Sequence, residues 1–81
     1  MAEFKADRIL DARGLNCPMP SVKAALELEG MAAGEVLEVL TDDPVSKKDL
    51  PLWAESTGNV VLGIEEGTDS TIKIYVKKAQ T

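Results

Sequence analysis

One thiol dominates the chemistry that this sequence could perform. The 81 residues include a single cysteine, Cys17, and no histidine. Without an imidazole, a Ser/His/Asp triad, a Cys/His dyad and a histidine-ligated metal site are all excluded. A single cysteine cannot form an intrachain disulfide or a four-cysteine zinc site, and no glycine-rich phosphate loop is present. We therefore expect no metal and no cofactor, and Cys17 is the candidate nucleophile.

The prolines around Cys17 predict that this residue lies at the entrance of a helix. Pro18 disfavours helical geometry in the residue before it. Pro18 and Pro20 both suit a first helical turn, where the amide that proline lacks has no intrahelical acceptor. A sulfur at this position faces free amides and the positive end of the helix dipole, which favours the thiolate over the thiol. Because Pro20 also disfavours helical geometry at Met19, a later helix start stays open.

The helix dipole alone lowers the pKa of the thiol only slightly. Its contribution of about 0.3–1 kcal/mol corresponds to less than about one pKa unit. Arg13 and Lys23 are the nearby cations that would lower the thiol pKa further, although the net charge of −5 opposes them. The alternative is that Cys17 is a small buried hydrophobe, as many free cysteines are. Its position between a glycine-containing loop and two prolines favours the functional interpretation.

Hydrophobic alternation and turn residues predict four strands and two helices. The last strand is the clearest, because its apolar residues at 72, 74 and 76 alternate with Lys73, Tyr75 and Lys77. One face of the sheet should therefore be buried and the other solvated. The first helix is expected over Pro18–Ala33, where Gly34 ends it. The strands are expected at Phe4–Asp11, Glu35–Thr41, Val60–Glu65 and Thr71–Lys78.

The second helix follows a turn at Asp42–Pro44. The adjacent carboxylates of this turn could bind a cation, but we interpret them as turn and helix-cap residues. Ser46 and Asp49 have capping-box spacing, and Pro51 can open a final helix that runs to Thr57. The sequence leaves open whether one kinked helix or two separate pieces form.

These elements predict an α+β fold with the order βαβαββ. Right-handed crossovers place both helices on the same face of the sheet. The expected architecture is a two-layer α/β sandwich, in which a four-stranded mixed sheet carries two helices on one face. A chain of this length has room for one hydrophobic core, so residues 1–81 should form a single domain.

Charge and hydropathy narrow the class of partner. The 14 acidic and 9 basic side chains give a net charge of −5, which argues against direct binding to nucleic acid. No window approaches the ~18 apolar residues that cross a membrane, and no targeting signal is visible. A small domain without disulfides suits a reducing compartment. We expect a cytoplasmic monomer whose partners are proteins.

The segment from Asp11 to Pro20, Asp-Ala-Arg-Gly-Leu-Asn-Cys-Pro-Met-Pro, resembles the signature of the TusA/SirA-like sulfur-carrier (sulfurtransferase) family. That signature is a Gly-Leu pair, one further residue, and then Cys-Pro-x-Pro. The resemblance covers nearly the whole chain and implies the same βαβαββ sandwich, with the cysteine at the start of the first helix. Further matches in order and spacing are Gly34–Val39, Asp42–Pro44, Asp49–Pro51, Trp53 and Thr57–Gly58.

The resemblance also implies an activity. In this family the cysteine accepts sulfane sulfur as a persulfide from a donor protein, often a pyridoxal-phosphate cysteine desulfurase or a rhodanese. It then passes the sulfur to an acceptor protein for tRNA thiolation, sulfur oxidation or molybdenum-cofactor assembly. By resemblance Cys17 is the carrier residue of a sulfurtransferase that acts with partner proteins. The residues that shape its surroundings are Arg13, Gly14, Pro18, Pro20 and Lys23.

Two departures from the family pattern concern docking and the second helix. Many members have a histidine directly after the glycine of the second helix, where this chain has Asn59. The first helix of the family is often richly basic, whereas this one carries only Lys23, which puts docking to an acidic partner surface in doubt.

Two other functions stay open from the sequence. The chain could be a non-catalytic regulatory or scaffold module that retains the fold, in which Cys17 packs or marks the helix start. A thiol peroxidase or redox sensor is the third possibility, but it would need an external thiol because no resolving cysteine is present.

Overall fold

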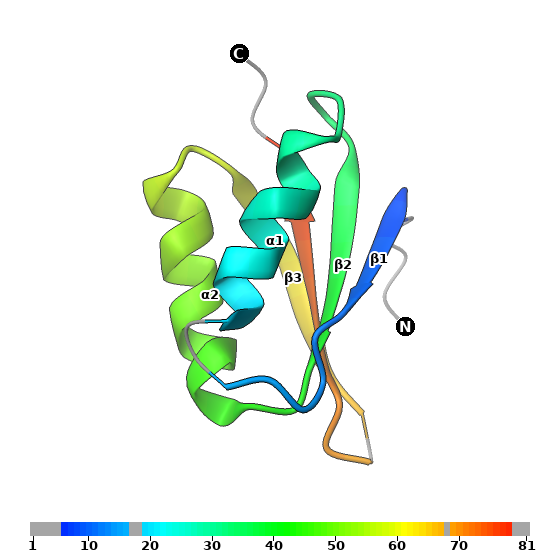
Figure 1. Cartoon of the computed structure of the whole chain (residues 1–81), viewed down its shortest axis with the longest axis vertical. Helices are drawn as coiled ribbons and strands as arrows, with labels where there is room; N and C mark the ends of the chain where they lie inside the picture. The colour runs from blue at the N-terminus through cyan, green and yellow to red at the C-terminus, as the bar shows by residue number, and fades with distance from the viewer. Residues whose placement is uncertain (1–5, 17–18, 68, 79–81) are drawn as a thin grey trace.

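The computed structural model describes residues 6–16, 19–67 and 69–78. Its elements follow the expected βαβαββ order, and the helices lie on the same side of the sheet (Figure 1). The α+β two-layer architecture is therefore confirmed. The elements are β1 (Arg8–Asp11), α1 (Met19–Glu29), β2 (Val36–Thr41), α2 (Pro44–Ser56), β3 (Val60–Glu66) and β4 (Ile72–Lys77).

The sheet is mixed, with the strand order β1-β2-β4-β3. The first two strands are parallel, and the other neighbouring pairs are antiparallel. In the central pair, Leu37 lies opposite Val76 and Val39 opposite Ile74. All four of these side chains are fully buried, so this face of the sheet forms the floor of the core. The helices complete the core with Ala24, Leu28, Leu50 and Ala54.

The opposite face of the sheet is less solvated than the alternation predicts. Tyr75 points to this face but is only 5% exposed. Its strand neighbours are Glu38 and Gly63, and its hydroxyl donates to Glu65 at 3.1 Å. Burial, together with these carboxylates, raises the pKa of Tyr75 to about 12. The prediction of a solvated face was therefore wrong at Tyr75, because its aromatic ring is buried among its neighbours on this face of the sheet.

The first helix is shorter than predicted. Its last residue is Glu29 instead of Ala33. The amides of Gly30 and Met31 make bonds three residues back, to Glu27 and Leu28. Such bonds tighten and close a helix end. Gly34 lies in the following turn, where its amide donates to Lys78 at the end of the sheet, and so it does not end the helix.

The second helix starts earlier than Pro51 and runs through it. Asp43 is its N-cap, because a carboxylate oxygen accepts from the Val45 amide at 3.2 Å, and Pro44 occupies the first helical position. The cap interpretation of the Asp42–Pro44 turn is therefore confirmed. The capping box expected at Ser46 was wrong, because the Ser46 hydroxyl instead donates to Asp43 at 3.1 Å.

The strand boundaries agree with the predictions within one residue, except in β1. That strand begins at Arg8 instead of Phe4, and Phe4 lies outside the described residues. Among the residues that the structure places, no helix has the length and apolar character needed to cross a membrane.

Candidate functional site

Both helices begin at the same edge of the sheet. The parallel strands β1 and β2 both end there, and each is followed by a helix. Figure 1 shows the N-termini of both helices at the lower end of the view, beside the loop that follows β1. Cys17 and Pro18 lie outside the described residues, so the site is defined here by its neighbours on either side, Ala12–Asn16 and Met19.

The loop before Cys17 is fixed by backbone bonds and by the core. Ala12 is fully buried, and its amide donates to Leu40 at 2.7 Å. The side chain of Leu15 packs against the core, and its amide donates to Ala12 at 3.3 Å. On the far side, the Met19 amide donates to Asn16 at 2.8 Å. The chain is therefore anchored on both sides of residues 17 and 18, and the regular helix begins at Met19.

Gly14 forms the tightest part of this loop. Its φ of +86° lies in the left-handed region, which glycine adopts without steric cost. Open space surrounds the position that a Cβ would take, so the backbone conformation is what requires glycine here. The Gly14 amide donates to Asp42 Oδ1 at 3.0 Å. Asp42 thus ties the loop to the end of β2.

Arg13 directs its guanidinium to Asp11. Its Nε and Nη2 donate to the two carboxylate oxygens, each at 2.9 Å, and its backbone amide donates to Oδ1 at 3.1 Å. These bonds lower the pKa of Asp11 from 3.8 to about 2 and raise the pKa of Arg13. Asp69 and Asp42 add to the negative field around Arg13. Asp11 therefore both orients Arg13 and caps the loop.

The other predicted site residues have different environments. Pro20 is fully buried beneath the first turn of α1. Lys23 is exposed one turn later. The first turn of α1 contains no acidic residue, so no carboxylate of that turn opposes the positive end of the helix dipole. Within the described ranges, no cluster of three or more metal-ligating side chains occurs.

Comparison with known proteins decides the family. Residues 8–78 match the family described as sulfurtransferase TusA. The chain belongs to the TusA family. A putative sulfur carrier protein of Thermotoga maritima is 43% identical over 95% of this chain and 98% of its own length. The sulfur carrier protein TusA of Allochromatium vinosum is 46% identical over 82% of this chain and 84% of its own length.

TusA-type domains also occur within longer relatives. A putative sulfur carrier protein of Aquifex aeolicus is 40% identical over 98% of this chain, but the match spans only 40% of that relative. Among solved structures, a SirA-like protein from Desulfitobacterium hafniense superposes with a TM-score of 0.79 at 30% identity. That match covers 90% of this chain and 99% of the other. The TusA/SirA-like fold expected from the sequence is therefore confirmed.

Sequence reasoning missed the role of Asp42 in this TusA-family site. The residue was interpreted only as part of a turn. A signal was available, because Asp42 directly follows β2 and the Gly14 loop follows the parallel strand β1. Residues that follow adjacent parallel strands meet at one edge of the sheet, so a side chain there can reach the neighbouring loop.

Proposed function

We propose that this protein is a sulfur carrier that accepts sulfane sulfur on Cys17 as a persulfide and relays it to an acceptor protein. The observation that carries the proposal is the match to the TusA family over residues 8–78, a range that includes the only cysteine of the chain. The anchored loop before Cys17 supports it, because a carrier thiol has to be held at the surface in a defined position.

The transfer needs one thiol from this chain and one from each partner. The Cys17 thiolate attacks the outer sulfur of a donor persulfide, the donor S–S bond breaks, and the donor thiolate leaves. An acceptor thiolate then attacks the outer sulfur now held on Cys17, and the Cys17 thiolate is released. Each step consumes one thiolate and releases another, so no external oxidant or reductant is needed.

The surroundings of Cys17 supply moderate activation. Both helices direct their positive ends to this edge of the sheet, which favours a thiolate there. By its chemistry Pro18 disfavours helical geometry in the residue before it. The buried Pro20 anchors the first turn of α1 in the core. Gly14 provides the turn, while Lys23 adds an exposed positive charge. The positive charge of Arg13 is largely offset by Asp11.

The partners follow from this chemistry. We propose a protein donor such as a cysteine desulfurase or a rhodanese, and a thiol-bearing acceptor in tRNA thiolation, sulfur oxidation or cofactor assembly. The net charge of −5 disfavours direct RNA contact even where the final product is thiolated RNA. A cytoplasmic monomer fits these roles, since a carrier has to release one partner before it meets the next.

Intact-mass spectrometry tests the proposal. Incubation with a cysteine desulfurase and free cysteine, or with a rhodanese and thiosulfate, should add the mass of one sulfur atom to the wild-type chain. The Cys17→Ser variant should stay unloaded but folded, because serine is a good residue at a helix entrance. Equal sulfur loading of both chains would contradict the assignment.

Alkylation distinguishes the carrier from a non-catalytic scaffold. Rapid labelling of native protein by iodoacetamide near neutral pH is expected of an accessible carrier thiol. Protection of Cys17 until the protein unfolds would instead favour a module that retains the fold without the chemistry.

A further inference from the structure

Thr41, the last residue of β2, places a hydroxyl group inside the protein. Its side chain is fully buried on the same face of the strand as the core residues Leu37 and Val39. A hydroxyl buried without a hydrogen-bond partner would cost stability. The Thr41 Oγ1 accepts a hydrogen bond from the backbone amide of Asp43 at 3.2 Å. The strand therefore ends in a polar group that contacts the turn after it.

The Thr41–Asp43 hydrogen bond determines the direction of the chain after β2. A threonine oxygen that accepts from the amide two residues later makes a local turn, which competes with continuation of the strand. The backbone of Asp43 is extended, with φ −97° and ψ 114°, and Pro44 begins α2 directly after it. Asp42 lies between the two bonded residues, so this bond restrains the backbone on both sides of Asp42.

Asp42 extends the pairing of β1 with β2 beyond the ends of both strands. The Ala12 amide donates to the backbone carbonyl of Leu40 at 2.7 Å. Two residues further along each chain, the Gly14 amide donates to Asp42 Oδ1 at 3.0 Å. A regular parallel ladder would supply a backbone carbonyl at that place. The side chain of Asp42 replaces this carbonyl, because the turn after Thr41 holds the residue beside the loop.

We propose that Thr41 is a positioning residue for sulfur transfer, which acts through Asp42 to hold the carrier loop, Ala12–Asn16. This inference rests on the proposed function. Asn16 directly precedes Cys17 in the sequence, and attack on a persulfide requires the reacting sulfur atoms to be aligned. Because Thr41 is fully buried, a partner protein cannot contact it. Its effect should therefore fall on the rate of transfer within the complex and not on partner binding.

The cap of α2 is a separate role of the same turn. The carboxylate of Asp43 accepts from the Val45 amide at 3.2 Å and from the Ser46 hydroxyl at 3.1 Å. Both contacts join the Asp43 side chain to α2, whereas Thr41 contacts the Asp43 backbone amide. Ser46→Ala therefore weakens the contacts of the cap and leaves the Thr41 bond in place.

Two substitutions separate the hydroxyl of Thr41 from its methyl group. Thr41→Val keeps nearly the same shape but lacks the acceptor oxygen, while Thr41→Ser keeps the oxygen and loses a buried methyl group. We expect Thr41→Val to speed hydrogen exchange at the Gly14 amide, and to slow the maximal rate of Cys17 loading from a cysteine desulfurase, by about threefold each. Thr41→Ser should stay within about twofold of the wild type in both measurements. The desulfurase concentration that gives half-maximal loading rate should change less than about twofold in either variant.

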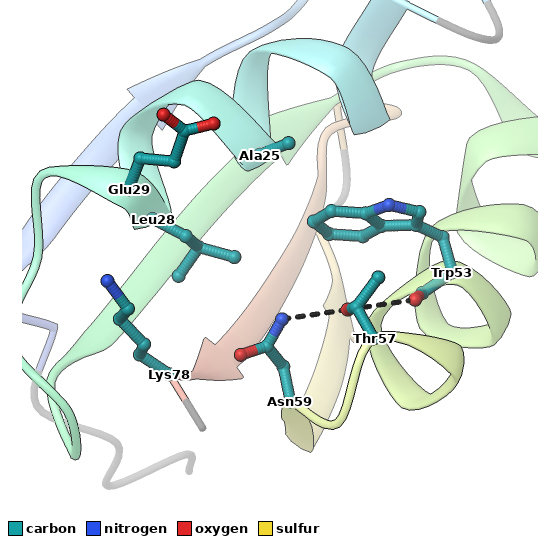
Figure 2. Close-up of a pocket in the computed structure, with 7 residues that line it drawn as sticks. All are labelled: Ala25, Leu28, Glu29, Trp53, Thr57, Asn59 and Lys78. Carbon is teal, nitrogen blue, oxygen red and sulfur yellow. Dashed lines mark hydrogen bonds between the residues drawn. The ribbon is translucent and has the colours of Figure 1, made fainter. Parts of the chain in front are cut away.

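Thr57 provides a matched control at the other end of α2. Figure 2 shows its hydroxyl between Asn59, which donates to it at 2.9 Å, and the Trp53 carbonyl, to which it donates at 3.1 Å. Thr57→Val makes the same chemical change as Thr41→Val, but at the C-cap of the helix. Thr57→Val and Ser46→Ala should both lower the stability measured by urea denaturation. Both should leave Gly14 exchange and Cys17 loading within about twofold of the wild type.

Three outcomes would overturn the role of Thr41 alone. A larger defect in Thr41→Ser than in Thr41→Val would assign the residue to core packing. Equal effects of Thr57→Val or Ser46→Ala on Gly14 exchange and loading would mean that a weakened α2 is the cause. A change only in the half-maximal desulfurase concentration would indicate altered partner binding. Failure of the wild type to take sulfur from either desulfurase or inorganic polysulfide would instead refute the carrier function itself, and the role of Thr41 in transfer with it.

Discussion

The Asp42 carboxylate accepts a hydrogen bond from the backbone amide of Gly14 at 3.0 Å, across 28 positions of sequence. Asp42 follows β2 and Gly14 lies in the loop after β1, so the bond crosses the edge where the parallel strands end. The neighbouring Asp43 caps α2. Two adjacent carboxylates therefore hold two different segments, the loop that leads to Cys17 and the helix beside it.

Removing the Asp42–Gly14 hydrogen bond should make the loop more mobile without unfolding the protein. A hydrogen bond of this kind contributes about 1 kcal/mol, so Asp42→Ala should speed hydrogen exchange at the Gly14 amide by about fivefold. Asp42→Asn keeps an acceptor oxygen and should retain most of the protection. If Gly14 exchange is the same in all three proteins, the carboxylate does not hold the loop.

The same pair of variants connects the loop to the proposed chemistry. Asp42→Ala should slow desulfurase-dependent loading of Cys17, because the thiol is held less well in position. Rescue by Asp42→Asn would show that the acceptor matters more than the charge. A loss in both variants would instead point to the negative charge.

The N-cap of α2 should contribute measurably to stability. Asp43→Ala leaves the Val45 amide without its side-chain acceptor and should lower the free energy of unfolding by about 1 kcal/mol. Urea denaturation followed by circular dichroism measures this change. Asp43→Asn is the matched control, since asparagine keeps an acceptor oxygen at the cap position. A loss of stability in Asp43→Asn as large as that in Asp43→Ala would mean that the cap hydrogen bond is not the main contribution of Asp43.

The sequence predicted features that depend on local order. The alternation in β4 was sufficient to orient Ile74 and Val76 toward the core, because strand geometry alone determines that pattern. The cysteine motif likewise located the loop and the helix entrance, since glycine and proline restrict the backbone locally. These features did not require knowledge of which strands are neighbours.

Features that depend on tertiary contacts were missed. The Asp42–Gly14 bond joins residues 28 positions apart, where the parallel strands β1 and β2 end, and no local pattern around either residue indicates it. The early end of α1 coincides with a contact from β1, because the Arg8 guanidinium reaches the Gly30 carbonyl at 3.5 Å. The position of Tyr75 depends on its neighbours across the sheet. Local patterns contain little information about such long-range partners.

Pro51 should be a point of reduced stability within a continuous helix. It lies inside α2, where proline removes one backbone hydrogen bond and crowds the preceding turn. Pro51→Ala should raise the free energy of unfolding by about 1–2 kcal/mol, after allowance for the greater entropy of the unfolded chain. Thermal and urea denaturation measure the change. A destabilised variant would show instead that packing of the half-buried proline ring outweighs its backbone cost.

The Asp11–Arg13 pair should be visible in a pH titration. The folded pKa of Asp11 is about 2, below its usual 3.8, so its stabilising contribution is complete above about pH 4 and is lost as pH falls toward 2. In Arg13→Gln the Asp11 pKa should return most of the way to 3.8, as followed by NMR of the carboxyl carbon. Asp69 is the internal control, because its low pKa depends mainly on Thr71 and only weakly on Arg13.

The same ion pair determines how Arg13 should affect the proposed carrier thiol. Asp11 offsets the charge of Arg13, so Arg13→Gln alone should raise the pKa of Cys17 only slightly. Asp11→Asn leaves that positive charge uncompensated and should lower the thiol pKa, which speeds alkylation near neutral pH. The pH dependence of iodoacetamide labelling reports each pKa, with Lys23→Gln as the comparison for an exposed cation outside the pair. If Arg13→Gln raises the thiol pKa as much as Lys23→Gln does, then Asp11 does not cancel the arginine charge at the sulfur. The pair would then serve to shape the loop and not to tune the thiol.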